Sequence, residues 1–227
     1  MVNEKITESS LSKIAFFDID GTLVKGQTQV LLIRYLYHNK IIGTKSLLQV
    51  LVWYLKYKFF SADIDQRMAK EFYYSLFRGK GISEVNEIIE DYFETYLKGK
   101  IYPESAELLE KYRKDGFIII LFSATISPIA EKLSNYFKAD LYFATEIEKK
   151  KNQYTGNVKG NIFIGTYRND SINKYLKNRK DIDKISVLSD RASDYELFKL
   201  ADEAIAVNPN RDLKKLAEEN KWEIIKL

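Results

Sequence analysis

Short apolar runs alternate with helical patterns along most of the chain. Five of these runs are predicted to be strands, and most of them are continuous in apolar character and not alternating: Ile14–Phe17, Phe117–Phe122, Ile185–Leu188, Glu203–Val207 and Trp222–Ile225. A continuous apolar run suits a strand that helices cover on both faces. Helical patterns lie between the later runs, at Pro103–Lys114, Ser127–Tyr136, Asp170–Asn178, Asp194–Leu200 and Asp212–Asn220. This alternation predicts an α/β fold with a Rossmann-like three-layer core around a parallel sheet.

Two further segments depart from simple alternation. Roughly eighty residues separate the first two predicted strands, which is too many for a simple connection from a strand to a helix. This region has helical periodicity and no convincing strand. We therefore expect an inserted helical domain over residues 25–100, and a catalytic core made of residues 1–24 and 101–227. Downstream, Asp140–Ile147 and Tyr154–Val158 flank the polar turn Glu148–Gln153, which predicts a small β-hairpin.

The composition narrows the chemistry. The 227 residues are 45% hydrophobic and 30% charged, as in an ordinary globular protein. The net charge is +4 and the basic residues are spread along the chain, which argues against nucleic acid and suits a small anionic substrate. The absence of cysteine excludes disulfides and thiolate chemistry, and the single histidine, His38, argues against a histidine metal cluster. Carboxylates remain as the candidate reactive groups.

The sequence favours a cytoplasmic protein. Met1–Lys13 is polar and lacks the apolar stretch of a signal peptide. The segment Leu47–Phe60 contains Lys56 and Lys58 and is too short and too charged to span a bilayer of ~30 Å. A buried helix is the favoured interpretation of this segment. A membrane-surface helix is the alternative, because aromatic residues and lysines alternate there.

Two carboxylates directly follow the first predicted strand. Asp18 and Asp20 lie in Asp18-Ile19-Asp20-Gly21-Thr22. Residues two apart on an extended chain point to the same side, and open α/β sheets bind ligands at the carboxyl ends of their strands. The two carboxylates repel each other unless a cation such as Mg²⁺ intervenes. One is then free to attack phosphorus, and the other can protonate the leaving oxygen. A solvated Asp-Gly turn is the alternative interpretation.

Other polar side chains follow two later strands. Ser123 follows Phe117–Phe122, with a helix expected to begin around Pro128, and its hydroxyl could hydrogen-bond a phosphoryl oxygen or cap that helix. Asp190 lies just after Ile185–Leu188 and could complete a metal site. Asp194, four residues later, could orient Asp190 or a metal-bound water, and could also cap a helix.

A phosphoryl-transfer site also needs a fixed cation, expected at a helix N-terminus on the ligand edge. Arg168 meets this condition. Lys174 is the second candidate, but it falls inside the predicted helix, more than a turn from the end that faces the ligand. A solvated surface charge is the alternative interpretation of either residue.

These elements, in this order, resemble the haloacid dehalogenase superfamily of phosphatases, and in particular the phosphoserine-phosphatase-like branch with a helical cap after the first motif. Asp18–Thr22 resembles the first motif and Ser123 the second. Gly160–Arg168 resembles the approach to the third motif, and Asp190 with Asp194 resembles the fourth. The resemblance covers nearly the whole chain, and residues 25–100 would be the cap.

The resemblance implies a role for each matching residue. Asp18 would be the nucleophile that forms an aspartyl-phosphate, and Asp20 the general acid and then the general base. Mg²⁺ would be held by Asp18, Asp190 and the backbone carbonyl of Asp20. Ser123 and Arg168 would bind the phosphoryl group, and Asp194 would orient Asp190 or a metal-bound water.

Three positions depart from the pattern of this branch. A lysine usually stands where this chain has Arg168, and Gly-Asp stands where it has Ser189-Asp190. Arginine can bind phosphate through two hydrogen bonds and serine is small, so we interpret both as variation. Phosphoserine phosphatases also typically carry a glutamate nine residues after the nucleophile, which pairs with the substrate amino group. Here that substrate-binding position is Gln27, a neutral amide, so we expect an ester without a free ammonium group.

The leading functional hypothesis is a Mg²⁺-dependent phosphatase that hydrolyses a small phosphate monoester through an aspartyl-phosphate. One alternative is a phosphotransferase of the same fold, in which an alcohol replaces water in the second step. Another is a catalytically silent module that binds a phosphorylated ligand.

Overall fold

The main sheet is built from parallel strands, with β1 in its interior. The computed structural model describes residues 12–59, 74–179 and 181–227, and its six-stranded sheet has the order β3-β2-β1-β6-β7-β8. These strands are β1 (Ser12–Asp18), β2 (Phe117–Ile126), β3 (Leu141–Thr145), β6 (Ile182–Ser189), β7 (Glu203–Val207) and β8 (Glu223–Ile225). From β1 the strand order runs outward in both directions, so the sheet has its topological switch point between β1 and β6. Open sheets bind ligands at such a point.

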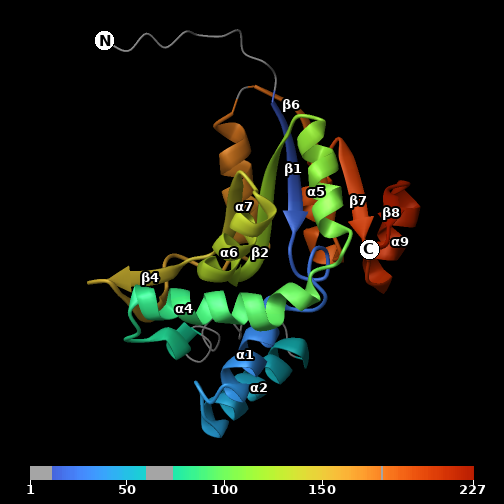
Figure 1. Cartoon of the computed structure of the whole chain (residues 1–227). Coiled ribbons are helices and arrows are strands. Elements are labelled where there is room, and N and C mark those ends of the chain that lie inside the picture. Colours follow the sequence, from blue (N-terminus) through green and yellow to red (C-terminus); the bar gives the residue numbers. More distant parts are fainter. Residues whose placement is uncertain (1–11, 60–73, 180) are drawn as a thin grey trace, which may run out of the picture.

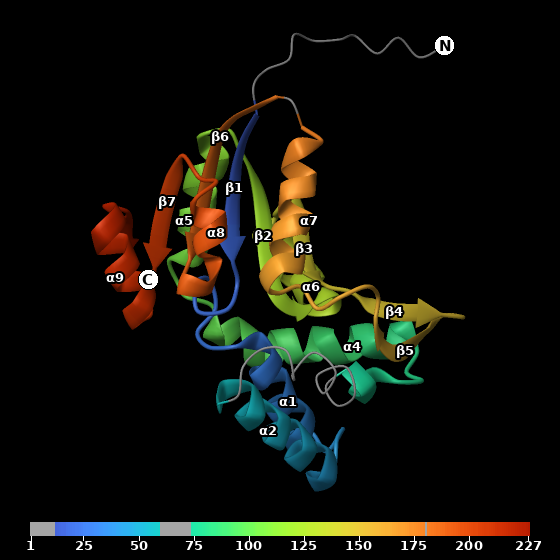
Figure 2. The ribbon, with the colours of Figure 1, turned by 180° about the vertical axis from the view of Figure 1, so that it is seen from behind.

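Alternate strand residues face opposite helical layers. Ala15 and Phe17 pack in the cluster that contains α5 and α6, whereas Ile14 and Phe16 pack with α7, α8 and α9. The bounds of these helices are α5 (Ser105–Lys114), α6 (Ser127–Phe137), α7 (Gly165–Lys177), α8 (Tyr195–Phe198) and α9 (Arg211–Asn220). Figure 1 shows α5 in front of the sheet, and the opposite view in Figure 2 shows α7 and α8 in front of it. The predicted three-layer core is confirmed.

Helices also lie beyond the carboxyl ends of the strands (Figure 1). They are α1 (Thr28–His38), α2 (Thr44–Phe59) and α4 (Ile82–Tyr92), with a π-helical turn at Phe93–Leu97 and 3₁₀ turns at Tyr74–Phe77 and Lys98–Lys100. The described residues within 25–100 form no strand, only isolated bridges such as the one between Gly81 and Gln153. The division into a core and a cap at residues 25 and 100 stays a prediction.

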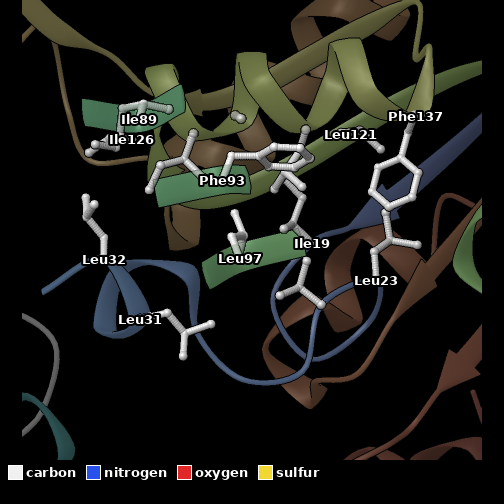
Figure 3. Close-up of a cluster of buried hydrophobic side chains, with 14 of the residues drawn as sticks. Ile19, Leu23, Leu31, Leu32, Ile89, Phe93, Leu97, Leu121, Ile126 and Phe137 are labelled. Atoms are coloured by element: carbon white, nitrogen blue, oxygen red, sulfur yellow. The ribbon is translucent and has the colours of Figure 1, made fainter. Parts of the chain in front are cut away.

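The hydrophobic core continues from the sheet into these helices. Figure 3 shows side chains of one buried cluster, which includes Ile19 and Leu23 from the turn after β1, Leu31 of α1, and Phe93 and Leu97 of the π-helical turn. All five side chains are buried. The turn that carries the Asp18–Thr22 motif is therefore anchored by apolar packing on both sides.

The predicted β-hairpin is present, but its bounds differ from the prediction. It consists of β4 (Ile147–Lys150) and β5 (Gln153–Val158), which pair antiparallel. Its turn is formed by Lys151 and Asn152, both with positive φ, as in a type I′ turn. The predicted first arm, Asp140–Ile147, was wrong, because most of it is β3, the parallel edge strand beside β2.

Helix positions differ from the prediction at three places. Helix α7 begins at Gly165 instead of Asp170, so Arg168 lies in its first turn. The predicted helix Asp194–Leu200 is a 3₁₀ turn, Ala192–Asp194, followed by the short α8. Helix α2 covers most of Leu47–Phe60, but Leu48 and Val52 are exposed, so this helix is only partly buried. The aromatic side chains of residues 53–60 and of residues 72–74 lie outside the described part.

We also searched the described residues for a helix with the length and apolar character needed to cross a membrane, and found none.

Candidate active site

Asp18 is the last residue of the central strand β1. The preceding residues Ile14–Phe17 are buried, and Asp18 pairs in register with Phe122 of β2. Its side chain is 7% exposed, and its Oδ2 accepts a hydrogen bond of 3.2 Å from Thr22 Oγ1. Burial raises the pKa of Asp18 well above its usual range, and the nearby carboxylates of Asp194, Asp190 and Asp20 raise it further. An acidic cluster therefore converges on this strand end.

The carboxylate of Asp20 is held from two sides. Its Oδ1 accepts a hydrogen bond of 2.6 Å from the backbone N–H of Thr28, the first residue of α1. Its Oδ2 accepts a hydrogen bond of 2.8 Å from Ser123 Oγ. The alternative of a freely solvated Asp-Gly turn does not describe this arrangement, because Asp20 is bound to both α1 and β2.

Ser123 lies inside β2, since this strand extends to Ile126 and not to Phe122 as predicted. Its hydroxyl oxygen accepts a hydrogen bond of 2.9 Å from the N–H of Thr125 while donating to Asp20. Helix α6 begins at Ser127, its N-cap is Ile126, and no side chain caps it. Ser123 is thus part of the polar cluster and does not cap the helix.

Asp190 follows β6 and approaches the turn after β1 very closely. Gly21 has a φ of +92°, and a Cβ at this position would lie 2.2 Å from Asp190 Oδ2. Only glycine gives the carboxylate this room. Burial is the largest influence that raises the pKa of Asp190 to about 6, against the lowering effect of Arg191, whose Nε lies 3.3 Å from Asp190 Oδ1.

Asp194, four residues after Asp190, forms a buried ion pair with Arg168. Arg168 Nη1 lies 2.6 Å from Asp194 Oδ1, and both side chains are less than a tenth exposed. Arg168 Nη2 donates to the carbonyl of Ser193 at 3.0 Å, and Ser189 Oγ donates to Asp194 Oδ2. Asp194 occupies the N-cap of α8 but makes no capping hydrogen bond. Its carboxylate holds Arg168 and Ser189 instead.

The remaining predicted residues differ in their surroundings. Lys174 is exposed on α7, whereas Arg168 is buried in the first turn of the same helix. Gln27 is the N-cap residue of α1 and is partly buried. Its side chain makes no hydrogen bond to the described part of the chain.

Four residues at this site were not predicted from the sequence: Thr28, Tyr92, Thr125 and Arg191. The guanidinium of Arg191 is close enough to Asp18 to lower its pKa, and the surrounding carboxylates raise the pKa of Arg191 despite its burial. Arg191 could have been identified from the sequence, because it is a cationic residue between Asp190 and Asp194 of the fourth motif. Thr28, Tyr92 and Thr125 gave no such indication, because their contacts join segments far apart in the sequence.

The donor set is suitable for a hard cation. No group of three or more His, Cys, Asp or Glu side chains in metal-binding geometry occurs among the described residues. Burial and neighbouring carboxylates nevertheless raise the pKa of both Asp18 and Asp190. A bound cation would stabilise the ionised form of these two carboxyl groups. Asp190 Oδ1 is also buried without a hydrogen-bond partner in the described structure. Both carboxylate oxygens of Asp20 already accept hydrogen bonds, from Thr28 and from Ser123.

Comparison with known proteins gives consistent results. The chain is 24% identical to the phosphoserine phosphatase SerB1 of Mycobacterium tuberculosis over 94% of this chain and 70% of that protein. It is 24% identical to a histidinol-phosphatase of Neisseria meningitidis over 95% of this chain and 99% of that protein.

Solved structures share the fold. A Bordetella pertussis protein of unknown function superposes with a TM-score of 0.86 at 19% identity, covering 95% of this chain and 98% of that one. A phosphoserine phosphatase, solved as an analogue of its phospho-aspartyl intermediate, gives a TM-score of 0.65 at 19% identity, covering 95% and 93%. The model of the haloacid dehalogenase-like hydrolases matches residues 15–199. The predicted superfamily is confirmed, and the chain belongs to the haloacid dehalogenase-like hydrolase family.

Proposed function

We propose that the chain is a Mg²⁺-dependent phosphatase that hydrolyses a small phosphate monoester through an aspartyl-phosphate on Asp18. This proposal rests on one observation: Asp18, Asp20 and Asp190 lie close to one another at the switch point of the sheet, and the carboxylate of Asp20 accepts a hydrogen bond from Ser123. The names of the phosphoserine phosphatase and histidinol-phosphatase relatives support a small phosphate monoester as the substrate.

Asp18 is suited to act as the nucleophile. One of its oxygens accepts the hydrogen bond from Thr22, which leaves the other to attack phosphorus. Burial favours the protonated form of this carboxyl, so attack needs compensating positive charge. Mg²⁺ held by Asp18, Asp190 and the carbonyl of Asp20 would supply that charge and polarise a phosphoryl oxygen. The Asp18 oxygen then bonds to phosphorus as the bond from phosphorus to the leaving oxygen breaks.

Asp20 is suited to acid–base work beside it. A protonated Asp20 gives its proton to the leaving oxygen during the first step. In the second step a water attacks phosphorus, Asp20 takes the proton of that water, and the bond between Asp18 and phosphorus breaks. The hydrogen bond from the N–H of Thr28 fixes the carboxyl group while it does so.

Arg168 is our candidate for the phosphoryl-binding cation. The ion pair with Asp194 fixes its guanidinium, and its buried Nε has no hydrogen-bond partner among the described residues. The exposure of Lys174 does not favour that residue for the role. Ser123 would bind the phosphoryl group with its hydroxyl, at the expense of its bond to Asp20.

The test is phosphate release by the purified chain from a panel of small phosphate esters, with Mg²⁺ and with excess chelator. We expect release that needs Mg²⁺. Full activity in chelator would contradict the metal requirement, and binding of phosphate esters without any turnover would indicate the silent module. Added alcohol acceptors separate hydrolysis from transfer, because a phosphotransferase would yield new phosphate esters. A cytoplasmic location stays a prediction.

A further inference from the structure

Thr28 uses three of its polar atoms to join three elements. Its N–H donates to Asp20 Oδ1 at 2.6 Å, and its hydroxyl donates to Thr125 Oγ1 in β2 at 2.8 Å. Its carbonyl accepts a hydrogen bond of 2.9 Å from the hydroxyl of Tyr92, the last residue of α4. Thr28 and Tyr92 are both fully buried. The carboxylate of Asp20 is thus connected through one residue to a helix that lies beyond the sheet.

The hydrogen bond from Thr28 determines which oxygen of Asp20 can carry a proton. A backbone N–H can donate but cannot accept, so a proton on Oδ1 would face another hydrogen and is disfavoured. The neighbour of Oδ2 is the hydroxyl of Ser123, which can both donate and accept. The transferable proton therefore belongs on Oδ2, the oxygen on the side of β2.

The hydrogen bond from Tyr92 has a donor that does not ionise at any working pH. Burial raises the pKa of the Tyr92 phenol, and the charge of Asp20 raises it further, so the phenol stays a donor. The π-helical turn Phe93–Leu97 follows directly. Such turns are often found at functional sites.

We propose that Thr28 and Tyr92 are positioning residues that aim the Asp20 carboxyl group at the leaving oxygen, so that the seating of α4 controls the acid–base step. This inference rests on the proposed function. It adds a prediction that a merely structural contact would not produce. Loss of the hydrogen bonds of Thr28 and Tyr92 should slow phosphoryl transfer from esters whose leaving group needs a proton. Transfer from esters whose leaving group needs no proton should change little.

A matched pair of substitutions separates the N–H of Thr28 from its hydroxyl. Thr28→Val removes only the hydroxyl bond to Thr125. Thr28→Pro also removes the N–H bond to Asp20. Proline is tolerated at the first residue of a helix. The preceding Gln27 has φ −108° and ψ 117°, which is the conformation favoured before proline. Tyr92→Phe is a third variant, which removes one hydroxyl and keeps the ring.

The measurement is kcat/KM in saturating Mg²⁺ for an alkyl phosphate and for p-nitrophenyl phosphate. This ratio covers the steps up to departure of the leaving group and excludes hydrolysis of the phosphoenzyme. We expect Thr28→Pro to lose about tenfold or more on the alkyl ester, part of the range that general acid catalysis supplies, and to lose little on the nitrophenyl ester. Thr28→Val, which keeps the N–H bond to Asp20, should change the rates on the two esters by equal factors, and Tyr92→Phe should show the Thr28→Pro pattern more weakly.

Equal losses of Thr28→Pro on the two esters, or the same pattern of losses in Thr28→Val and Thr28→Pro, would overturn the inference while the wild type stays active. A wild type that releases no phosphate from either ester would instead overturn the proposed function, and this inference with it. Circular dichroism and thermal melting verify that each variant folds. If Thr28→Pro does not fold, Tyr92→Phe decides, and a loss confined to the alkyl ester is the supporting result.

Discussion

Asp18 is held in surroundings that oppose its own charge. It lies at the buried end of β1, and three other aspartates raise its pKa together with burial. A carboxyl whose folded pKa lies above its unfolded value destabilises the fold once the pH exceeds the unfolded value. Such unfavourable arrangements are typical of functional sites, where charge is compensated only when a ligand is bound.

Asp18→Asn should abolish turnover and preserve the fold, because the amide is nearly isosteric but cannot attack phosphorus. Phosphate release, and formation of the acyl phosphate or of its beryllofluoride mimic on Asp18, test this. Asp20→Asn is the matched control: it should still be phosphorylated slowly by esters with good leaving groups, since general acid catalysis contributes ~10²- to 10⁴-fold. Near wild-type turnover by Asp18→Asn, or phosphate on another residue, would contradict the mechanism.

Asp190→Asn should change stability in a pH-dependent way. A rise of the Asp190 pKa from 3.8 to about 6 corresponds to about 3 kcal/mol of unfavourable free energy for the ionised group. This penalty is absent below about pH 4, grows between pH 4 and 6, and is complete above pH 6. In chelator, the variant should therefore be more stable than the wild type above pH 6, and the difference should shrink toward pH 4.

Urea unfolding across this pH range measures the effect, and Asp170→Asn, at an exposed position on α7, is the control. Added Mg²⁺ should stabilise the wild type but not Asp190→Asn, because ligand binding to the folded state raises its stability. A difference that is independent of pH would refute the burial argument. Equal stabilisation of both proteins by Mg²⁺ would show that Asp190 is not a ligand of the metal.

The turn after β1 is the element whose backbone the site depends on most. Gly21 and Gly26 both have a φ of +92°, but only Gly21 has a neighbour where a side chain would lie. Gly26→Ala should cost about 1–2 kcal/mol for the strained backbone alone. Gly21→Ala carries the same strain and also displaces Asp190, so it should unfold at lower urea and lose its response to Mg²⁺. Equal stability and equal Mg²⁺ response of the two variants would show that Asp190 can move away freely.

The interior elements could be predicted from the sequence because their patterns are local. The continuous apolar runs of β1 and β6 indicate burial on both faces, and the motif aspartates follow directly from the strand ends. The edge strand β3 could not be assigned in this way. Leu141–Thr145 has the pattern of a hairpin arm, and nothing local determines that it pairs with β2 instead.

The start of α7 was missed for a different reason. Gly165, Thr166 and Tyr167 have modest intrinsic preference for helix, so the sequence favours a loop there. In the fold, the buried ion pair between Arg168 and Asp194 holds the first turn against β6 and α8. Tertiary contact overrides local preference at that point, and the same ion pair brings the third and fourth motifs together.

Across the whole molecule, the candidate site is assembled from segments that are distant in sequence. Asp20 is bound by α1 and β2, Gly21 makes room for Asp190 after β6, and Tyr92 reaches Thr28 from α4. The polar contacts around Asp20 toward the helices are made by uncharged groups: the N–H of Thr28, the hydroxyls of Thr28 and Thr125, and the side-chain amide of Gln29, which donates to the carbonyl of Ala124. This side of the site offers no carboxylate to a cationic leaving group within the contacts described.

Phosphoserine should therefore not be the best substrate. Gln27 stands where the resembling phosphoserine phosphatases carry a glutamate, and we expect a substrate to meet a neutral amide at this position. The relatives do not decide between phosphoserine and histidinol phosphate as substrates, because the chain is equally similar to a phosphoserine phosphatase and a histidinol-phosphatase, at 24% identity each. An amide cannot replace the charge pair that an ammonium group needs once it leaves water.

We expect kcat/KM for phosphoserine to lie below that for the best of a set of aryl, sugar and lipid-like phosphates. Gln27→Glu should raise the relative rate on phosphoserine, because it restores a carboxylate at that position, and Gln49→Glu, at an exposed position on α2, serves as the control for added charge alone. A preference of the wild type for phosphoserine of about tenfold, equivalent to ~1.4 kcal/mol of transition-state binding, would refute the argument. So would a Gln27→Glu variant whose gain on phosphoserine is matched by Gln49→Glu, because the effect would then reflect the net charge of the protein and not a specific contact at Gln27.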